Sequence, residues 1–72
     1  MGAVAAIGER TRVAGFALAG VTVLVAERPQ EVLDAWADLP EGTALVIVTP
    51  AAARALGPER LAATRPLTAV MP

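Results

Sequence analysis

The sequence predicts a small α/β fold: a doubly wound parallel sheet of four strands with helices on both faces. Short apolar runs alternate with helix-like segments along all 72 residues. The most continuous run, residues 44–48, is apolar throughout, as expected of an inner strand that helices cover on both sides. The connections are short, and right-handed crossovers then give a parallel sheet. By analogy with other small doubly wound folds, we expect the strand order 2-1-3-4.

The chain is expected to begin with a strand and a helix. Residues 3–7 form an apolar run that Gly8 ends, which is typical of a buried strand. Thr11 is expected to cap a helix over residues 12–19. Gly15 lowers the stability of this helix, so we expect it to be there because the helix approaches the sheet closely.

The second strand and the clearest helix follow. Gly20 suits the left-handed residue after a helix, and residues 21–25 are rich in the β-branched residues that strands favour. Pro29 is a good first helical residue for a helix over residues 30–39. The apolar stripe of that helix consists of Val32, Leu33, Trp36 and Leu39. We expect Trp36 to pack in the core, with docking of its indole edge on a partner as the alternative.

The last part of the chain repeats the pattern. The inner strand 44–48 leads to Thr49, which is expected to cap an alanine-rich helix over residues 51–56. The pair Gly57-Pro58 is expected to break this helix before one or two further turns. Residues 67–71 form the fourth strand. The chain, residues 1–72, is therefore expected to be one domain.

The composition argues against catalysis, binding of transition metals and binding of nucleic acids. The sequence contains no cysteine, histidine, lysine or serine, so it lacks the usual nucleophiles, bases and transition-metal ligands. We therefore expect no enzyme activity, no metal and no cofactor. A net charge of −1 argues against nucleic-acid binding, which normally needs a basic face. Asp34 and Asp38 lie on one side of a predicted helix, where exposed charges are the simplest interpretation.

The stretch from residue 13 to residue 26 carries no charge over 14 residues, which is too short to span a bilayer. The apolar part of a signal peptide is the alternative interpretation. Against it, Gly15 and Gly20 interrupt the stretch, and Glu9 lies in the region that would have to be basic. We therefore expect no direct insertion into a membrane.

Several segments together resemble the F subunit of the V-type and archaeal A-type rotary ATPases. They are Val4-Ala5-Ala6-Ile7-Gly8-Glu9, Gly15-Phe16-Ala17-Leu18-Ala19-Gly20-Val21, Val25-Ala26-Glu27 with Pro29-Gln30-Glu31, Ala44-Leu45-Val46-Ile47-Val48-Thr49, and residues 65–72. The G-F-x-L-A-G element is the most specific of these. Family members usually have Asp where this chain has Glu9, and they usually continue into a C-terminal helix. This sequence stops at Pro72, so the resemblance implies either a truncated sequence or a short relative that lacks this helix.

The resemblance implies a non-catalytic rotor subunit of the central stalk. Such a subunit binds the coiled-coil D subunit of the stalk, helps couple ATP turnover to proton or sodium transport, and lies on the cytoplasmic side, peripheral to the membrane. We expect the partner interface in the charged loops after the first two strands, where loops vary without disturbing the core. These residues are Glu9, Arg10, Thr11, Arg12, Glu27 and Arg28.

Two alternatives stay open. The loop from Gly8 to Arg12 lies between a strand and a helix, where this class of fold binds ligands, so it is a candidate site for a nucleotide or an anion. Against this, the glycine spacing fits neither familiar phosphate-binding loop, and Glu9 would repel an anion. The second alternative is a protein-interaction module outside any ATPase.

Overall fold

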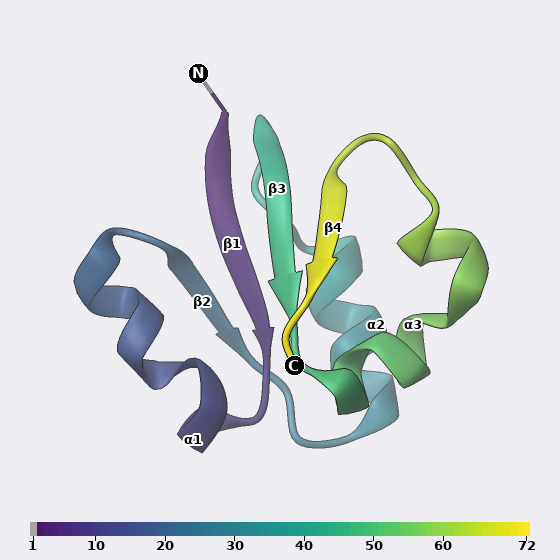
Figure 1. Ribbon diagram of the computed structural model, residues 1–72, viewed down its shortest axis with the longest axis horizontal. Helices are drawn as coiled ribbons and strands as arrows, with labels where there is room; N and C mark the ends of the chain where they lie inside the picture. Colours follow the sequence, from purple (N-terminus) through teal and green to yellow (C-terminus); the bar gives the residue numbers. More distant parts are fainter. Residues whose placement is uncertain (1) are drawn as a thin grey trace.

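A computed structural model describes residues 2–72 and shows a four-stranded parallel sheet with helices on both faces (Figure 1). The elements in chain order are β1 (Ala3–Gly8), α1 (Arg10–Val13), the 3-10 helix η1 (Ala14–Ala19), β2 (Thr22–Val25), α2 (Pro29–Ala37), β3 (Thr43–Val48), α3 (Pro50–Leu61) and β4 (Leu67–Val70). The strand order is β2-β1-β3-β4, which confirms the expected order. The architecture is that of a Rossmann-like or flavodoxin-like fold.

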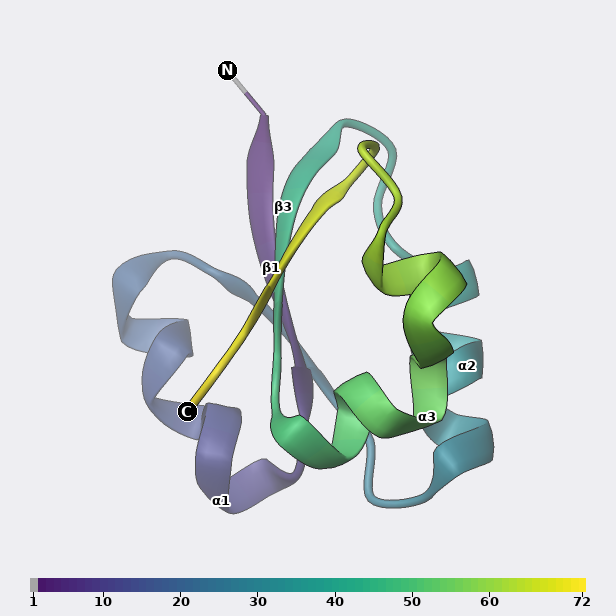
Figure 2. The same ribbon diagram turned by 45° about the vertical axis from the view of Figure 1, so that its right-hand side comes forward.

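The helices form two unequal layers. α1 and η1 lie on one side of the sheet, and α2 and α3 lie side by side on the other (Figure 2). Crossover handedness explains the division: the step from β1 to β2 runs in one direction across the sheet, whereas the steps to β3 and then β4 run in the other. Right-handed connections must then place the intervening helices on opposite faces.

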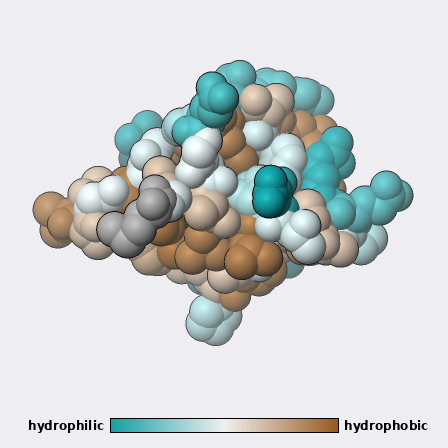
Figure 3. Space-filling view, turned by 90° about the horizontal axis from the view of Figure 1, so that it is seen from above, coloured by the Kyte–Doolittle hydropathy of each residue, from teal (hydrophilic) through white to brown (hydrophobic). Residues whose placement is uncertain are grey.

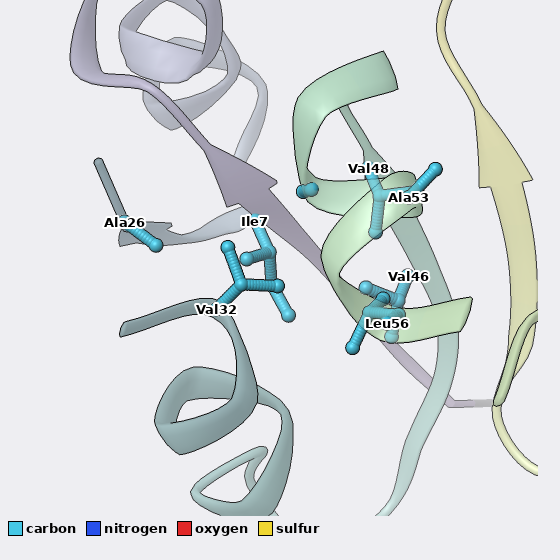
Figure 4. Close-up of a cluster of buried hydrophobic side chains, with 8 residues drawn as sticks. Ile7, Ala26, Val32, Val46, Val48, Ala53 and Leu56 are labelled. Atoms are coloured by element: carbon cyan, nitrogen blue, oxygen red, sulfur yellow. The ribbon is translucent and has the colours of Figure 1, made fainter. Parts of the chain in front are cut away.

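The hydrophobic core lies on the side of α2 and α3. Figure 4 shows its side chains converging from the sheet and from both helices. The cluster consists of Ile7, Ala26, Val32, Val46, Val48, Ala52, Ala53 and Leu56. The α2 stripe packs against it through Leu33, Trp36 and Leu39, which are half-buried. Trp36 thus packs against the core as expected, and it also lines a hollow at the surface. On the other side of the sheet, Val13 is the buried residue that α1 supplies.

The first helix differs from the expectation. α1 begins at Arg10, because the backbone N–H groups of Arg12 and Val13 donate to the carbonyl oxygen of Glu9 (2.9 and 3.1 Å). Thr11 therefore lies inside the first turn, and the expectation that it caps the helix is wrong. Beyond Val13 the chain continues as a 3-10 helix of six residues instead of an α-helix.

Of the expectations for the two glycines in this segment, one is confirmed and one is wrong. Gly20 has φ 79° after the last residue of η1, which confirms the expected left-handed position. Gly15 is exposed, and a Cβ placed on it would meet no atom within 4 Å, so the expected close approach to the sheet is wrong. Leu18 in the same 3-10 helix is 96% exposed. The helical layer over β1 and β2 is therefore thin.

The α3 helix is kinked where the sequence predicts a break. Gly57 has φ 82° and ψ 165°, which is outside the helical region and open mainly to glycine. Pro58 cannot donate a backbone hydrogen bond across the kink, and the Arg60 guanidinium donates to the carbonyl oxygen of Leu56 at 3.0 Å instead. None of the helices that residues 2–72 form is long and apolar enough to cross a membrane.

Candidate partner interface

The two loops expected to form the interface lie together at the carboxyl end of the sheet. The backbone N–H of Ala26, after β2, donates to the carbonyl oxygen of Gly8 at the end of β1 (2.9 Å). One residue further on, the backbone N–H of Arg10 donates to Glu27 Oε2 (2.9 Å). Residues 9–12 and 27–28 therefore form one continuous surface, because parallel strands end at the same edge.

Gly8 gives this end of the sheet its close packing. A Cβ on Gly8 would overlap Thr49 Cγ2 and would lie 2.7 Å from Thr49 Oγ1. The missing side chain lets β3 bring Thr49 next to β1, where its backbone N–H donates to the carbonyl oxygen of Ile7 (3.2 Å). Gly8 thus allows β1 and β3 to pack closely. This role does not require that the loop bind a phosphate.

Thr49 connects α3 to the loop after β1. Its hydroxyl donates to Glu9 Oε1 at 2.6 Å and accepts from the backbone N–H of Ala52 at 3.3 Å, which confirms Thr49 as the cap of α3. The Thr49 hydrogen bond is the main cause that lowers the pKa of Glu9, followed by a backbone hydrogen bond. Partial burial opposes this, and Arg12 and Arg54 add a smaller lowering. Glu9 is therefore held as a carboxylate.

Glu27 and Glu31 are also engaged within the fold. Glu31 Oε1 accepts from the backbone N–H groups of Glu27 (2.8 Å) and Arg28 (3.1 Å) at the start of α2. Glu27 in turn accepts from Arg10 at the start of α1. Each carboxylate satisfies donors that a helix start leaves free. The acidic residues here thus fix the loops in place.

The cationic side chains are the part of this surface that a partner can reach. Arg10, Thr11 and Arg28 are exposed, and within residues 2–72 neither the Arg10 nor the Arg28 guanidinium forms a hydrogen bond or an ion pair. Arg12 Nη2 donates to the carbonyl oxygen of Pro72 at 3.0 Å, so this side chain lies beside the chain that leaves β4. The surface therefore presents positive charge outward.

The shape of this region does not favour a nucleotide. The cavity between the two loops has a volume of about 70 Å³, whereas small-molecule pockets usually hold about 300 Å³ or more. Its lining includes two acidic residues, Glu9 and Glu27, and one basic residue, Arg28, so the acidic residues outnumber the basic one. A larger hollow of about 590 Å³ lies at the α3 kink, with Trp36 in its wall. Residues 8–12 take no part in that hollow.

Sequence reasoning missed the contacts made across the sheet. It placed Thr49 only as a helix cap, although this residue also binds Glu9 from 40 positions away. Asp34 is exposed and accepts from Gln30 Nε2 at 3.0 Å. In the part of the chain that the structure describes, no three acidic, histidine or cysteine residues are grouped so that they could hold a metal ion.

Comparison with known proteins gives one kind of match. The protein-family model described as ATP synthase (F/14-kDa) subunit matches residues 4–72. No curated protein and no solved structure matches the chain. The matched region runs from β1 to the residues after β4, so it contains all four strands and every helix described above.

Proposed function

The chain belongs to the family of the ATP synthase F subunit of V/A-type ATPases, and from this membership we propose that it is a non-catalytic subunit of the central stalk. It docks on the D subunit of the stalk, turns with the rotor and so helps couple ATP turnover to ion transport on the cytoplasmic side of the membrane. The observation that carries this proposal is the family match over residues 4–72.

The chemistry of the chain supports a role without catalysis. The sequence has no serine, cysteine, histidine or lysine, and the carboxylates of Glu9, Glu27 and Glu31 at the candidate surface are occupied by donors of the fold itself. A side chain that acts as a general base must be free to accept a proton from a bound substrate. A subunit that acts by being held against a neighbour needs no such group.

The loops at the carboxyl end of the sheet are our proposed contact with that neighbour. Arg10, Thr11 and Arg28 supply exposed groups, while Glu9, Arg12 and Glu27 hold the loops through hydrogen bonds within the fold. Exposed guanidinium groups suit an acidic partner surface, because arginine pairs with carboxylates through two parallel hydrogen bonds.

The experiment mixes the purified chain with the stalk D subunit of the same organism and measures the mass of the product by size-exclusion chromatography with light scattering. We expect a stable complex of one copy of each. Arg28→Glu should weaken the complex, whereas Arg60→Glu, which reverses the same charge on α3 away from this surface, should not. Failure of the unaltered chain to bind the D subunit would contradict the proposal.

The nucleotide alternative has its own test. Titration with ATP, ADP or inorganic phosphate should leave the backbone amide signals of residues 8–12 unmoved in NMR spectra. Saturable shifts confined to this loop would instead support ligand binding there. An interaction module outside any ATPase would bind other proteins and leave the D subunit unbound.

A further inference from the structure

β3 and β4 leave one of their faces without a helical cover. Side chains alternate between the two faces of a strand, and paired residues of parallel strands share a face. Val46 and Val48 belong to the core under α2 and α3, so Leu45 and Ile47 lie on the opposite face. Val4 of β1 pairs with Leu45, and Leu67 and Ala69 of β4 pair with Leu45 and Ile47, so these three residues lie on the same face. We call the set of Val4, Leu45, Ile47, Leu67 and Ala69 the open face.

Burial differs sharply between the two faces. Val46 and Val48 are 0% exposed, whereas Leu67 on the open face is 57% exposed and Ala69 is exposed. The other members of the open face are half-buried. α1 and η1 lie on this side of the sheet, but they pack chiefly against β1 and β2 (Figure 2). The open face is thus an apolar surface of β3 and β4 that the chain itself covers only at one margin.

The size of the uncovered strip matches one helix. On the opposite face two helices, α2 and α3, lie side by side: α2 packs against β1, and α3 packs against β1, β3 and β4. A helix is about 10 Å wide with its side chains, and neighbouring strands are about 4.8 Å apart, so one helix covers about two strands. α1 with η1 occupies the width of β1 and β2. The width that remains is that of a single further helix.

One arginine lies near each end of the open face. Residues 43–49 and 66–72 contain no charged residue. Arg12 lies at the carboxyl end through its hydrogen bond to Pro72. At the amino end, a hollow of about 500 Å³ is lined by Leu67 and by Arg65, its one charged residue. Viewed from above, the largest hydrophobic area lies along the lower part of the view, whereas the most hydrophilic residues lie at the top and on the right (Figure 3).

We propose that the open face binds one amphipathic α-helix of the stalk partner. The apolar stripe of that helix lies on Leu45, Ile47 and Leu67, and acidic side chains near its two ends pair with Arg12 and Arg65. β3 is six residues long, or about 20 Å, so the contact takes about 13 residues of helix. The inference rests on the proposed function and adds a second contact surface, and the kind of segment that binds it, to the loops of residues 9–12 and 27–28.

A second copy of the chain fits this surface less well. In a two-fold pair each open face would meet the same face of its partner. An antiparallel arrangement would then bring Arg12 of one copy towards Arg65 of the other, and a parallel one would bring identical arginines together. Both arrangements put like charges at the ends of the contact. A helix with acidic ends avoids this repulsion.

The test uses two substitutions on β4 that differ in the face they alter. Leu67 and Val70 are 57% and 50% exposed, and Val70 lies on the opposite face because it pairs with Val48. We expect Leu67→Asp to weaken binding to the D subunit by about tenfold or more, as burial of a carboxylate in an apolar contact does. Val70→Asp should change the affinity by less than about twofold. Isothermal titration calorimetry measures both.

A second measurement covers the possibility that Leu67→Asp unfolds the chain. Because the sequence has no cysteine, Leu67→Cys and Val70→Cys each give one site for a polarity-sensitive dye. Addition of the D subunit should shift the emission of the dye at position 67 to the blue and leave the dye at position 70 unchanged.

The outcomes separate this inference from the proposed function. Equal binding of the wild-type chain and Leu67→Asp would overturn the inference and leave the function intact. A wild-type chain that fails to bind the D subunit would overturn the function itself. Self-association of the chain that Leu67→Asp abolishes would assign the open face to a second copy and would also overturn the inference.

Discussion

At the scale of single residues, Gly8 occupies a position that has no room for a side chain. A Cβ at this position would overlap Thr49. The neighbours of Thr49 in β3 and α3 are buried in a close-packed core, so a shift of Thr49 would cost free energy. We expect Gly8→Ala to lower the free energy of unfolding by about 1–3 kcal/mol through overpacking. Urea denaturation followed by Trp36 fluorescence measures the change.

The matched control is Gly15→Ala. A Cβ at Gly15 meets no atom within 4 Å, and Gly15 does not have a positive φ. This substitution should leave stability unchanged or raise it by up to about 1 kcal/mol, because alanine restricts the unfolded chain. Equal losses in the two variants would contradict the role assigned to the contact between Gly8 and Thr49.

The pair of Thr49 and Glu9 makes stability depend on pH. The pKa of Glu9 is lowered in the folded chain, chiefly by the Thr49 hydroxyl. The ionised carboxylate therefore stabilises the fold at pH values above its ordinary pKa of about 4.3, and this contribution is lost as the pH falls through the lowered pKa. NMR titration should show the pKa of Glu9 rising towards its ordinary value in Thr49→Val.

Thr49→Ser keeps the hydroxyl and is the control for this titration. The pKa of Glu9 should stay lowered in Thr49→Ser, because the serine hydroxyl can donate the same hydrogen bond. A pKa that rises equally in both variants would show that the hydroxyl is not the cause.

At the scale of elements, the kink of α3 depends on one glycine. Gly57→Ala would place a side chain at φ 82°, ψ 165° and should cost about 1–3 kcal/mol of stability. Glu59→Ala, an exposed position two residues later, should stay within about 0.5 kcal/mol of the wild-type chain. Thermal unfolding followed by circular dichroism compares the two. A Gly57→Ala variant as stable as the wild-type chain would mean that the kink is not required.

The strands were predictable because their apolar runs are short and bounded by turn residues. All four strands occur where the sequence predicts them, within one or two residues at each end. The first helix was less predictable. Its start depends on the carbonyl oxygen of Glu9 and on Glu27, which lies 17 residues beyond Arg10 along the chain, and no local pattern reveals such a contact. Thr11 therefore looked like a cap and is not one.

The position of the candidate surface was predictable for a topological reason. Loops that follow parallel strands lie at one edge of the sheet, so residues 9–12 and 27–28 had to be neighbours. The sequence could not reveal that Glu9 and Glu27 serve the fold whereas Arg10 and Arg28 stay exposed. The open face was not predictable, because the sequence does not show how far a short helical layer extends over the sheet.

At the scale of the whole molecule, the core is unequally divided. Eight buried residues cluster between the sheet and the helices α2 and α3, while the other side of the sheet has the buried residues Val13 and Ala6 under a thin helical layer. A domain of this size buries only about 60% of the surface that its unfolded chain exposes, so its stability alone is marginal. A partner helix on the open face would complete the second layer.

Binding should therefore stabilise the chain measurably. With free D subunit at about one hundred times its Kd, mass action adds about 2.7 kcal/mol, which should raise the Tm by about 10 °C or more for a domain of 72 residues. Differential scanning calorimetry of the chain with and without the D subunit measures the shift. Leu67→Asp at the same concentrations should show a much smaller one.

The most direct test of the central claim is to identify what the chain is bound to in its own cell. The tagged chain is expressed at its natural level, purified under mild detergent, and the bound proteins are identified by mass spectrometry. We predict recovery of V/A-type ATPase subunits with the stalk D subunit among them, at a yield that Leu67→Asp reduces and Val70→Asp does not. Recovery of the tagged chain with no ATPase subunit, from cells that contain the assembled ATPase, would contradict the claim.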